Sequence, residues 1–255
     1  MSSSRHERLR PIRPSLVPLE AFADRLRSEA AAVGVALTDQ HAARLIRYLQ
    51  LIQQWRRPAG LTAVVDPFEA ARVHIADSLL CLRANIAPNA AVMDVGSGAG
   101  LPGIPLAIVR SDLRITLVEA EGRKAAFLEM AVRELALSVQ ILARRAEDAA
   151  HDPAEREQYD AVVARAVAPL RALFELTLPF ARIGGIAVFL KGPGVGRELR
   201  GADRARESLG GGGAALIEAQ LSGGEGRRIV VVPKVRATPP GYPRRPGVPS
   251  RKPLQ

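Results

Sequence analysis

A glycine-rich turn, set between a short apolar run and the start of a helix, constrains the fold of this chain more than any other stretch. Residues 91–95 are typical of a buried strand, and residues 102–110 are typical of a helix. Between them lie Gly96, Gly98 and Gly100 at alternate positions. Glycine lets the backbone approach a ligand closely, and the helix N-terminus adds free N–H groups. The sequence therefore predicts a nucleotide-type ligand at this turn.

Strand and helix patterns alternate after Pro88 and end in two neighbouring strands. This alternation predicts an α/β fold with a doubly wound, mostly parallel, Rossmann-like sheet of seven strands and an antiparallel terminal strand pair. The expected strands are 91–95, 114–119, 138–142, 159–164, 185–191, 214–221 and 227–233. The expected helices in this part of the chain are 102–110, 122–136, 169–181 and 194–208.

The sequence divides into four segments by composition and pattern. Residues 1–18 carry three prolines and few apolar residues, so they are expected to form a disordered basic tail. Residues 19–87 show only helical patterns and are expected to form a helical N-terminal section. Residues 88–235 form the predicted sheet domain. Residues 236–255 are rich in proline and arginine and are expected to be an extended C-terminal arm that does not pack.

The two ends of the chain hold almost all of its net charge of +10. Residues 1–18 contain four Arg and one Glu, and residues 226–255 contain six Arg and two Lys with no acidic residue. Basic ends of this kind bind polyanions, because each phosphate contact releases counterions. The single cysteine, Cys81, excludes an intramolecular disulfide, and neither a membrane span nor a secretory signal is recognisable. A cytoplasmic protein without membrane contact is therefore expected.

The glycines can be read in two spacings, and each spacing is typical of a different ligand. Gly98, Gly100 and Gly103 match the dinucleotide pattern Gly-x-Gly-x-x-Gly, which favours a nicotinamide-dependent oxidoreductase that binds NAD. In that register two further residues separate the strand from the first glycine of the pattern. Gly96, Gly98 and Gly100, with Asp94 two residues earlier, instead match the turn of S-adenosylmethionine-dependent methyltransferases. This second register is favoured, because Asp94 can accept N–H bonds from the loop and suits a cationic methionine group.

Residues after the next two strands extend the predicted site. Glu119 ends the second strand and can accept both ribose hydroxyls in either register. Ala146 and Glu147 follow the third strand and can line an adenine pocket. Since ligands of open α/β sheets bind at the carboxyl ends of the strands, these residues are expected beside the glycine turn. The strand-end pattern thus predicts cofactor contacts from Asp94 and Glu119 as well as from the glycines.

Several stretches resemble one known family, and they occur in order from Trp55 onward. They are Trp55–Thr62 (WRRPAGLT), His74–Ser78 (HIADS), Asp94–Leu106 (DVGSGAGLPGIPL), Leu117–Lys124 (LVEAEGRK), Arg165–Leu170 (RAVAPL), Leu190–Gly192 (LKG) and Tyr242–Leu254 (YPRRPGVPSRKPL). On these residues the chain resembles the glucose-inhibited division protein B family, bacterial enzymes that methylate guanine N7 in small-subunit (16S) ribosomal RNA. It departs from the family pattern at Gly60, where many members have Asn, and at Ala120, where Ser is usual.

The resemblance implies a class I methyltransferase fold that takes S-adenosyl-L-methionine as its cofactor. It implies cofactor contacts at Gly96, Leu101, Ala146, Glu147 and Arg165. The implied partner is small-subunit ribosomal RNA, either free or within a 30S particle, and no metal is expected. Arg165 follows the fourth strand and is the candidate catalytic residue, which would orient the base or the cofactor carboxylate.

Basic residues in two places are candidates for RNA contact. Arg123 and Lys124 open the helix after Glu119, and the C-terminal arm holds four more cations. These four are Arg244, Arg245, Arg251 and Lys252. Aromatic residues make up only 4% of the chain, so contacts to phosphates and to RNA shape are expected rather than a broad stacking surface.

The implied reaction agrees with the absence of a recognisable nucleophile. Guanine N7 has a lone pair and no proton, so in-line methyl transfer needs neither a general base nor a covalent intermediate. Cys81 lies in an apolar helical stretch and is expected to be a core residue. His74 and Asp77 share a helix face and are expected either to close over the site or to serve packing. An oxidoreductase and a non-catalytic RNA-binding module remain the alternatives.

Overall fold

The computed structural model describes residues 19–255, so the predicted tail over 1–18 lies outside the described residues. The described part begins with two helices, α1(Leu19–Ala32) and α2(Asp39–Trp55). A continuous helical stretch follows, in which α3(Pro67–Ala70), a π-helical turn η1(Ala71–Ala76), α4(Asp77–Leu79) and a 3-10 segment η2(Leu80–Ala84) succeed one another. None of the helices in residues 19–255 has the length and apolar character needed to span a bilayer.

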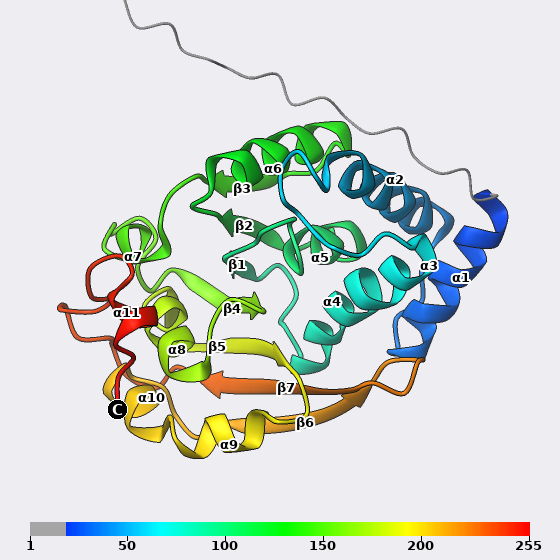
Figure 1. The fold of residues 1–255 in the computed structure, drawn as a ribbon. Coiled ribbons are helices and arrows are strands. Elements are labelled where there is room, and N and C mark those ends of the chain that lie inside the picture. The colour runs from blue at the N-terminus through cyan, green and yellow to red at the C-terminus, as the bar shows by residue number, and fades with distance from the viewer. Residues whose placement is uncertain (1–18) are drawn as a thin grey trace, which may run out of the picture.

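The sheet has seven strands in the order β3-β2-β1-β4-β5-β7-β6 (Figure 1). The strands are β1(Ala91–Val95), β2(Arg114–Val118), β3(Val139–Leu142), β4(Tyr159–Arg165), β5(Ala181–Lys191), β6(Ala215–Gln220) and β7(Gly226–Pro233). The first five pair in parallel, whereas β7 runs antiparallel to both β5 and β6. The structure therefore confirms the predicted doubly wound sheet with its antiparallel terminal pair.

Hydrophobic cores lie on both faces of this sheet. Alternate strand residues point to opposite faces, and in β4 Val163 joins one core while Val162 and Ala164 join the cores opposite. The larger core includes the N-terminal helices, α5(Gly103–Val109) and α6(Gly122–Glu134). The other face is covered by α8(Leu170–Thr177) with α9(Val195–Arg200) and α10(Asp203–Ser208). The helical N-terminal section thus shares one core with the sheet.

Helix ends differ from the sequence prediction in two places. The helix expected over 169–181 ends at Thr177, because Pro179 has no backbone N–H to continue the helical hydrogen bonds. The helix expected over 194–208 is two helices, α9 and α10, which are separated at Gly201 and Ala202. A short helix that the sequence pattern did not predict, α7(Ala146–Ala149), follows β3.

The prediction that residues 236–255 form an extended, unpacked arm is wrong. The arm folds back beside α7 and α8 and ends in α11(Val248–Arg251) (Figure 1). Arg156 donates to the carbonyl oxygens of Thr238 at 2.7 Å and Tyr242 at 2.8 Å. Prolines exclude a strand ladder, but their rings pack, and Pro243 is buried. A proline-rich segment is therefore held in place by side chains of the domain.

Candidate functional site

The glycine loop between β1 and α5 has the backbone geometry that only glycine adopts readily. Gly96, Gly98 and Gly100 have φ values of +71°, +59° and +91°. A Cβ atom at Gly96 would lie 2.8 Å from Cγ2 of Val167, and one at Gly100 would lie 2.5 Å from Cδ1 of Ile104. A Cβ at Gly98 would meet nothing closer than the carbonyl oxygen of Gly96, at 3.9 Å. Gly98 therefore presents bare backbone toward open space.

Asp94 is completely buried at the end of β1 and anchors the start of α5. Its Oδ2 accepts the backbone N–H of Gly103 at 2.9 Å. A Cβ at Gly103 would lie 2.3 Å from Cδ2 of Leu117, so this glycine allows α5 to pack closely on the sheet. The Oδ1 atom of Asp94 has no hydrogen-bond partner among the described residues. Burial raises the pKa of Asp94 to about 7.

Glu119 joins the glycine loop to the start of the next helix. Its Oε2 accepts the N–H of Gly98 at 2.8 Å, and its Oε1 accepts the N–H of Glu121 at 2.7 Å. Each carboxylate oxygen can accept a second hydrogen bond. The residue is buried, and its position beside Gly98 matches the predicted arrangement of strand-end carboxylates.

Tyr48 of α2 also supports the glycine loop, and the sequence analysis did not single it out. Its hydroxyl donates to the carbonyl oxygen of Ala99 at 2.6 Å, and burial raises its pKa well above the usual value. In the sequence it is one residue of an apolar helical stripe, so the pattern favours a core position. The contact ties the helical N-terminal section directly to the loop.

Arg165 lies at the end of β4 in a cavity of about 360 Å³, here called the arginine pocket. The pocket is lined by Val73, His74, Asp77, Arg165, Ala166, Leu190, Lys191, Gly192 and Arg227. Arg165 donates to Val73 O at 2.8 Å and to Oδ2 of Asp77 at 3.0 Å. Arg227 donates through Nε to Oδ1 of the same carboxylate at 2.7 Å. Two guanidinium groups thus share one buried carboxylate.

His74 stands in the π-helical turn at the edge of the arginine pocket. Its Nε2 lies 3.0 Å from Oγ1 of Thr62, and burial, followed by the charge of Arg165, lowers its pKa to about 4. The imidazole is therefore neutral at physiological pH. Cys81 is fully buried, and burial raises the pKa of its thiol, so the prediction of a core residue is confirmed.

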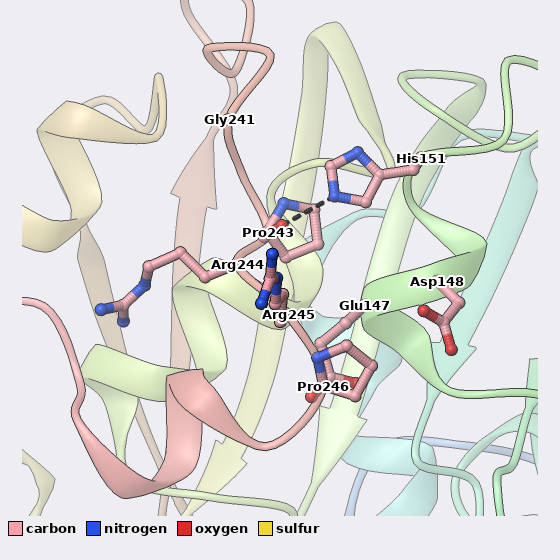
Figure 2. A pocket seen from close by; sticks show the side chains of 8 residues that line it. All are labelled: Glu147, Asp148, His151, Gly241, Pro243, Arg244, Arg245 and Pro246. Carbon is pink, nitrogen blue, oxygen red and sulfur yellow. Dashed lines mark hydrogen bonds between the residues drawn. The ribbon is translucent and has the colours of Figure 1, made fainter.

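Ala146 and Glu147 begin α7, and Glu147 faces the C-terminal arm across a second cavity of about 370 Å³, here called the arm pocket. Oε1 of Glu147 accepts the backbone N–H of Gly247 at 2.8 Å, and Nε2 of His151 lies 2.7 Å from the carbonyl oxygen of Pro243. Figure 2 shows Glu147, Asp148 and His151 on one side of this pocket and the arm on the other, with Arg244 pointing away. Sequence reasoning did not connect Glu147 with the arm.

The predicted RNA-binding cations differ in how they are paired. Arg123 and Lys124 both form ion pairs with Glu121, at 3.4 Å and 2.9 Å. Arg244 forms a paired contact with the buried carboxylate of Glu175, at 2.9 and 2.7 Å. Three further arm cations have exposed side chains and no ion pair within residues 19–255: Arg245, Arg251 and Lys252.

The cofactor-binding residues predicted from sequence are brought to one edge of the sheet. Asp94 and the loop from Gly96 to Leu101 follow β1, Glu119 follows β2, Glu147 follows β3 and Arg165 ends β4. These strands are neighbours in the order β3-β2-β1-β4. The carboxyl edge of an open parallel sheet, where the strand order reverses, is where such folds bind ligands.

The raised pKa of Asp94 predicts a pH-dependent stability. Between its ordinary pKa of 3.8 and about 7 the folded chain holds a proton that the unfolded chain has lost, so this group's contribution to stability falls as pH rises through that range. Asp94→Asn keeps an acceptor for Gly103 and removes the ionisation. The gain in unfolding free energy of the variant over the wild type should grow from about pH 4 to pH 7 and then level off.

Urea denaturation of both proteins across this pH range measures the difference directly. The lowered pKa of His74 acts with the opposite sign between about 4 and 6.5, but it is common to both proteins and cancels. A difference that does not change with pH would show that Asp94 ionises normally.

The family model described as rRNA small subunit methyltransferase G (GidB) matches residues 41–219. The chain belongs to this family. The ribosomal RNA small subunit methyltransferase G of Moorella thermoacetica is 42% identical over 225 residues, which cover 87% of this chain and 94% of that protein. The corresponding protein of Pelotomaculum thermopropionicum is 40% identical over 239 residues, 92% of this chain and all of the relative.

Membership of the rRNA small subunit methyltransferase G family confirms the resemblance drawn from the quoted stretches. The matched range contains the glycine loop, Glu119, Glu147 and Arg165. It ends before β7, so Arg227 and the C-terminal arm lie outside it. The structure of this chain places Arg227 in the arginine pocket and the C-terminal arm beside Glu147.

Proposed function

We propose that this chain methylates N7 of a guanine in small-subunit (16S) ribosomal RNA with S-adenosylmethionine as methyl donor. One observation carries the proposal: the glycine loop, held by the carboxylates of Asp94 and Glu119, follows β1, and Arg165 ends the neighbouring strand β4 at the same edge of the sheet. The curated relatives, named for methylation of small-subunit ribosomal RNA, support the substrate class. The quoted motifs support guanine N7 as the acceptor. Because ribosomal RNA is cytoplasmic in bacteria, a cytoplasmic location belongs to the same proposal.

The residues at the sheet edge fit this cofactor. Gly98 leaves space where a side chain would stand, and Oδ1 of Asp94 is a buried acceptor without a partner among the described residues. Glu119 retains acceptor capacity for ribose hydroxyls. The residues that would hold the cofactor are Asp94, Gly96, Gly98, Gly100, Leu101, Glu119, Ala146, Glu147 and Arg165. When bound, it supplies a methyl group carried on a positively charged sulfur.

Methyl transfer to guanine N7 requires little of the protein beyond alignment of the base with the methyl donor. Guanine N7 has a free lone pair in the plane of the ring, so no side chain has to remove a proton. The chain has to hold the base in line at short range and keep water out, which is catalysis by positioning. Arg165 suits this alignment from the cofactor side, because its contacts with Asp77 and the carbonyl oxygen of Val73 fix its guanidinium group.

Exposed arm cations are proposed to hold the RNA backbone. Changing Arg245, Arg251 and Lys252 together to Gln should weaken RNA binding and lower the slope of log affinity against log salt by about 2, since each phosphate contact contributes about 0.7–0.9. Cofactor affinity should not change, because the three side chains are exposed and none of them is among the residues proposed to hold the cofactor. Filter binding at several salt concentrations measures the slope. An unchanged slope would exclude the arm as a phosphate contact.

Calorimetric titration and a methyl-transfer assay test the proposed function. The chain should bind S-adenosylhomocysteine and not NAD, and it should transfer methyl groups to small-subunit ribosomal RNA, naked or in 30S particles. Mapping of the product should place the methyl group on a guanine N7. Binding of NAD alone would favour an oxidoreductase, and RNA binding without methyl transfer would favour a non-catalytic module.

A further inference from the structure

We propose that Arg227 determines the choice of acceptor base by donating a hydrogen bond to O6 of guanine in the arginine pocket, while Arg165 serves the cofactor side. The inference rests on the proposed methylation of guanine N7. Arg227 comes from β7, outside the stretch that the family model matches. No motif in the sequence singled it out.

The strand order places the two arginines on opposite sides of the pocket. Arg165 pairs with Leu190 of β5, and on the other side of β5 Lys191 pairs with Arg228. Arg227 directly precedes Arg228 in β7, so one strand separates it from Arg165, which corresponds to about 10 Å between backbones. Asp77 bridges this gap, with one oxygen 3.0 Å from Arg165 and the other 2.7 Å from Arg227. The carboxylate thereby fixes both guanidinium groups.

The two arginines differ in their distance from the glycine loop. The loop follows β1, and Arg165 ends β4, which is the strand that pairs with β1. A Cβ at Gly96 of the loop would lie 2.8 Å from Val167, two residues after Arg165. Arg227 belongs to β7, which is separated from β4 by β5, so it lies on the side of the pocket away from the loop, near Lys191 and Gly192. This side is open to a base that approaches from solvent.

Arg227 retains a donor for such a base. Its Nε contacts Asp77 and one terminal nitrogen donates to the carbonyl oxygen of Gly226 at 3.3 Å, whereas the other terminal nitrogen has no partner within residues 19–255. The side chain is 23% exposed, so it can be reached without unfolding. A guanidinium group can only donate hydrogen bonds. The free nitrogen thus selects an acceptor atom on the base.

Guanine offers that acceptor next to the reacting atom. Its N7 and O6 lie side by side on one edge, whereas adenine carries an amino donor in place of O6. When N7 faces the methyl group, O6 is the neighbouring atom available to Arg227. Adenine would set its amino group against a cation that cannot accept a hydrogen bond. The shared carboxylate of Asp77 limits the positive charge beside a purine that itself becomes cationic.

Arg227→Met tests the assignment, with Arg228→Met as the matched control. Arg228 is the next residue on the same strand and pairs instead with Glu218 at 2.8 Å. Arg227→Met should lower single-turnover methyl transfer to small-subunit ribosomal RNA about 10- to 100-fold, as expected for loss of a charged hydrogen bond. Its affinity for S-adenosylhomocysteine should stay within about twofold of the wild type. Arg228→Met should match the wild type in both.

A base-analogue cycle shows whether the lost contact is to O6. The methylated guanine, once mapped, is replaced by 2-aminopurine, which keeps N7 and lacks O6. The analogue should slow methyl transfer by the wild type by the same factor by which Arg227→Met slows transfer to guanine. The analogue should slow the variant no further. If the two changes instead slow the reaction independently, so that their factors multiply, the proposal is overturned, and so it is if the variant binds S-adenosylhomocysteine weakly. Independent effects together with a lower salt slope would identify a phosphate contact instead.

A second variant guards against loss of folding. Arg227→Lys keeps a positive charge for Asp77 but lacks the second, rigidly placed donor, so it should give the same coupling with the analogue. If Arg227→Lys and the analogue slow methyl transfer independently, the proposal is overturned even if Arg227→Met does not fold. Independent effects in a protein whose wild type binds the cofactor and methylates guanine contradict this inference alone. A wild-type protein that methylates no guanine would contradict both this inference and the proposed function.

Discussion

Arg244→Met should lower the free energy of unfolding by about 3 kcal/mol, the low end of the cost of breaking a buried ion pair. Glu175 in α8 is completely buried, and the guanidinium group of Arg244 contacts both of its carboxylate oxygens. Within residues 19–255, this carboxylate would then keep only the hydrogen bond from the backbone N–H of residue 244. The low end of the range applies because Arg244 is itself 28% exposed, so water can reach the gap.

Urea denaturation measures the effect, and Arg245→Met is the control. Arg245 is the neighbouring residue, is exposed and forms no ion pair within the described part of the chain, so its replacement should change stability by less than about 0.5 kcal/mol. The double variant Arg244→Met with Glu175→Leu should recover most of the loss, because it leaves no buried charge. Equal stability of Arg244→Met and the wild type would contradict a packed arm.

Gly98→Asp should weaken S-adenosylhomocysteine binding and methyl transfer by more than about 100-fold. The side chain would enter the open space in front of the loop and bring a second negative charge beside Glu119, whose Oε2 lies 2.8 Å from the nitrogen of residue 98. The fold itself should tolerate the change, because no neighbouring atom stands in the way and aspartate accepts a left-handed backbone better than most residues.

Gly34→Asp is the matched control for this prediction. Gly34 also has a positive φ, +88°, and a Cβ there would meet no atom within 4 Å. It lies directly after α1, away from the predicted cofactor site. Calorimetry should show normal affinity for Gly34→Asp, and thermal unfolding should show similar losses for both variants. Normal cofactor binding by Gly98→Asp would refute the assigned role of the glycine loop.

Local patterns were sufficient to predict the sheet edge. Asp94, the alternating glycines and Glu119 each stand at a strand end, and a parallel sheet brings strand ends together without further information. The apolar pattern also predicted a helix over residues 102–110, and Gly103 does begin α5, where it lies close to Leu117. In these cases the spacing of the apolar residues was enough to locate where each strand ends and the following helix begins.

Contacts between distant stretches could not be predicted in this way. Asp77 and Arg227 are 150 residues apart, and Glu175 and Arg244 are 69 apart. In each pair the sequence around the arginine indicates only a basic strand or a proline-rich segment. The wrong prediction of an unpacked arm has the same origin. Composition indicates how a segment behaves in isolation, but it does not show that a distant buried carboxylate will pair with it.

The packed arm has a consequence for folding during synthesis. Residues 244 and 247 are synthesised after the elements that carry Glu175 and Glu147, yet they satisfy the carboxylates of those two residues. A nascent chain can assemble β1–β5, since these strands pair with one another, but it holds an unpaired buried carboxylate until Arg244 emerges. Emergence of the arm therefore stabilises a sheet that has already formed, and chains truncated before Arg244 should be cleaved faster by proteases.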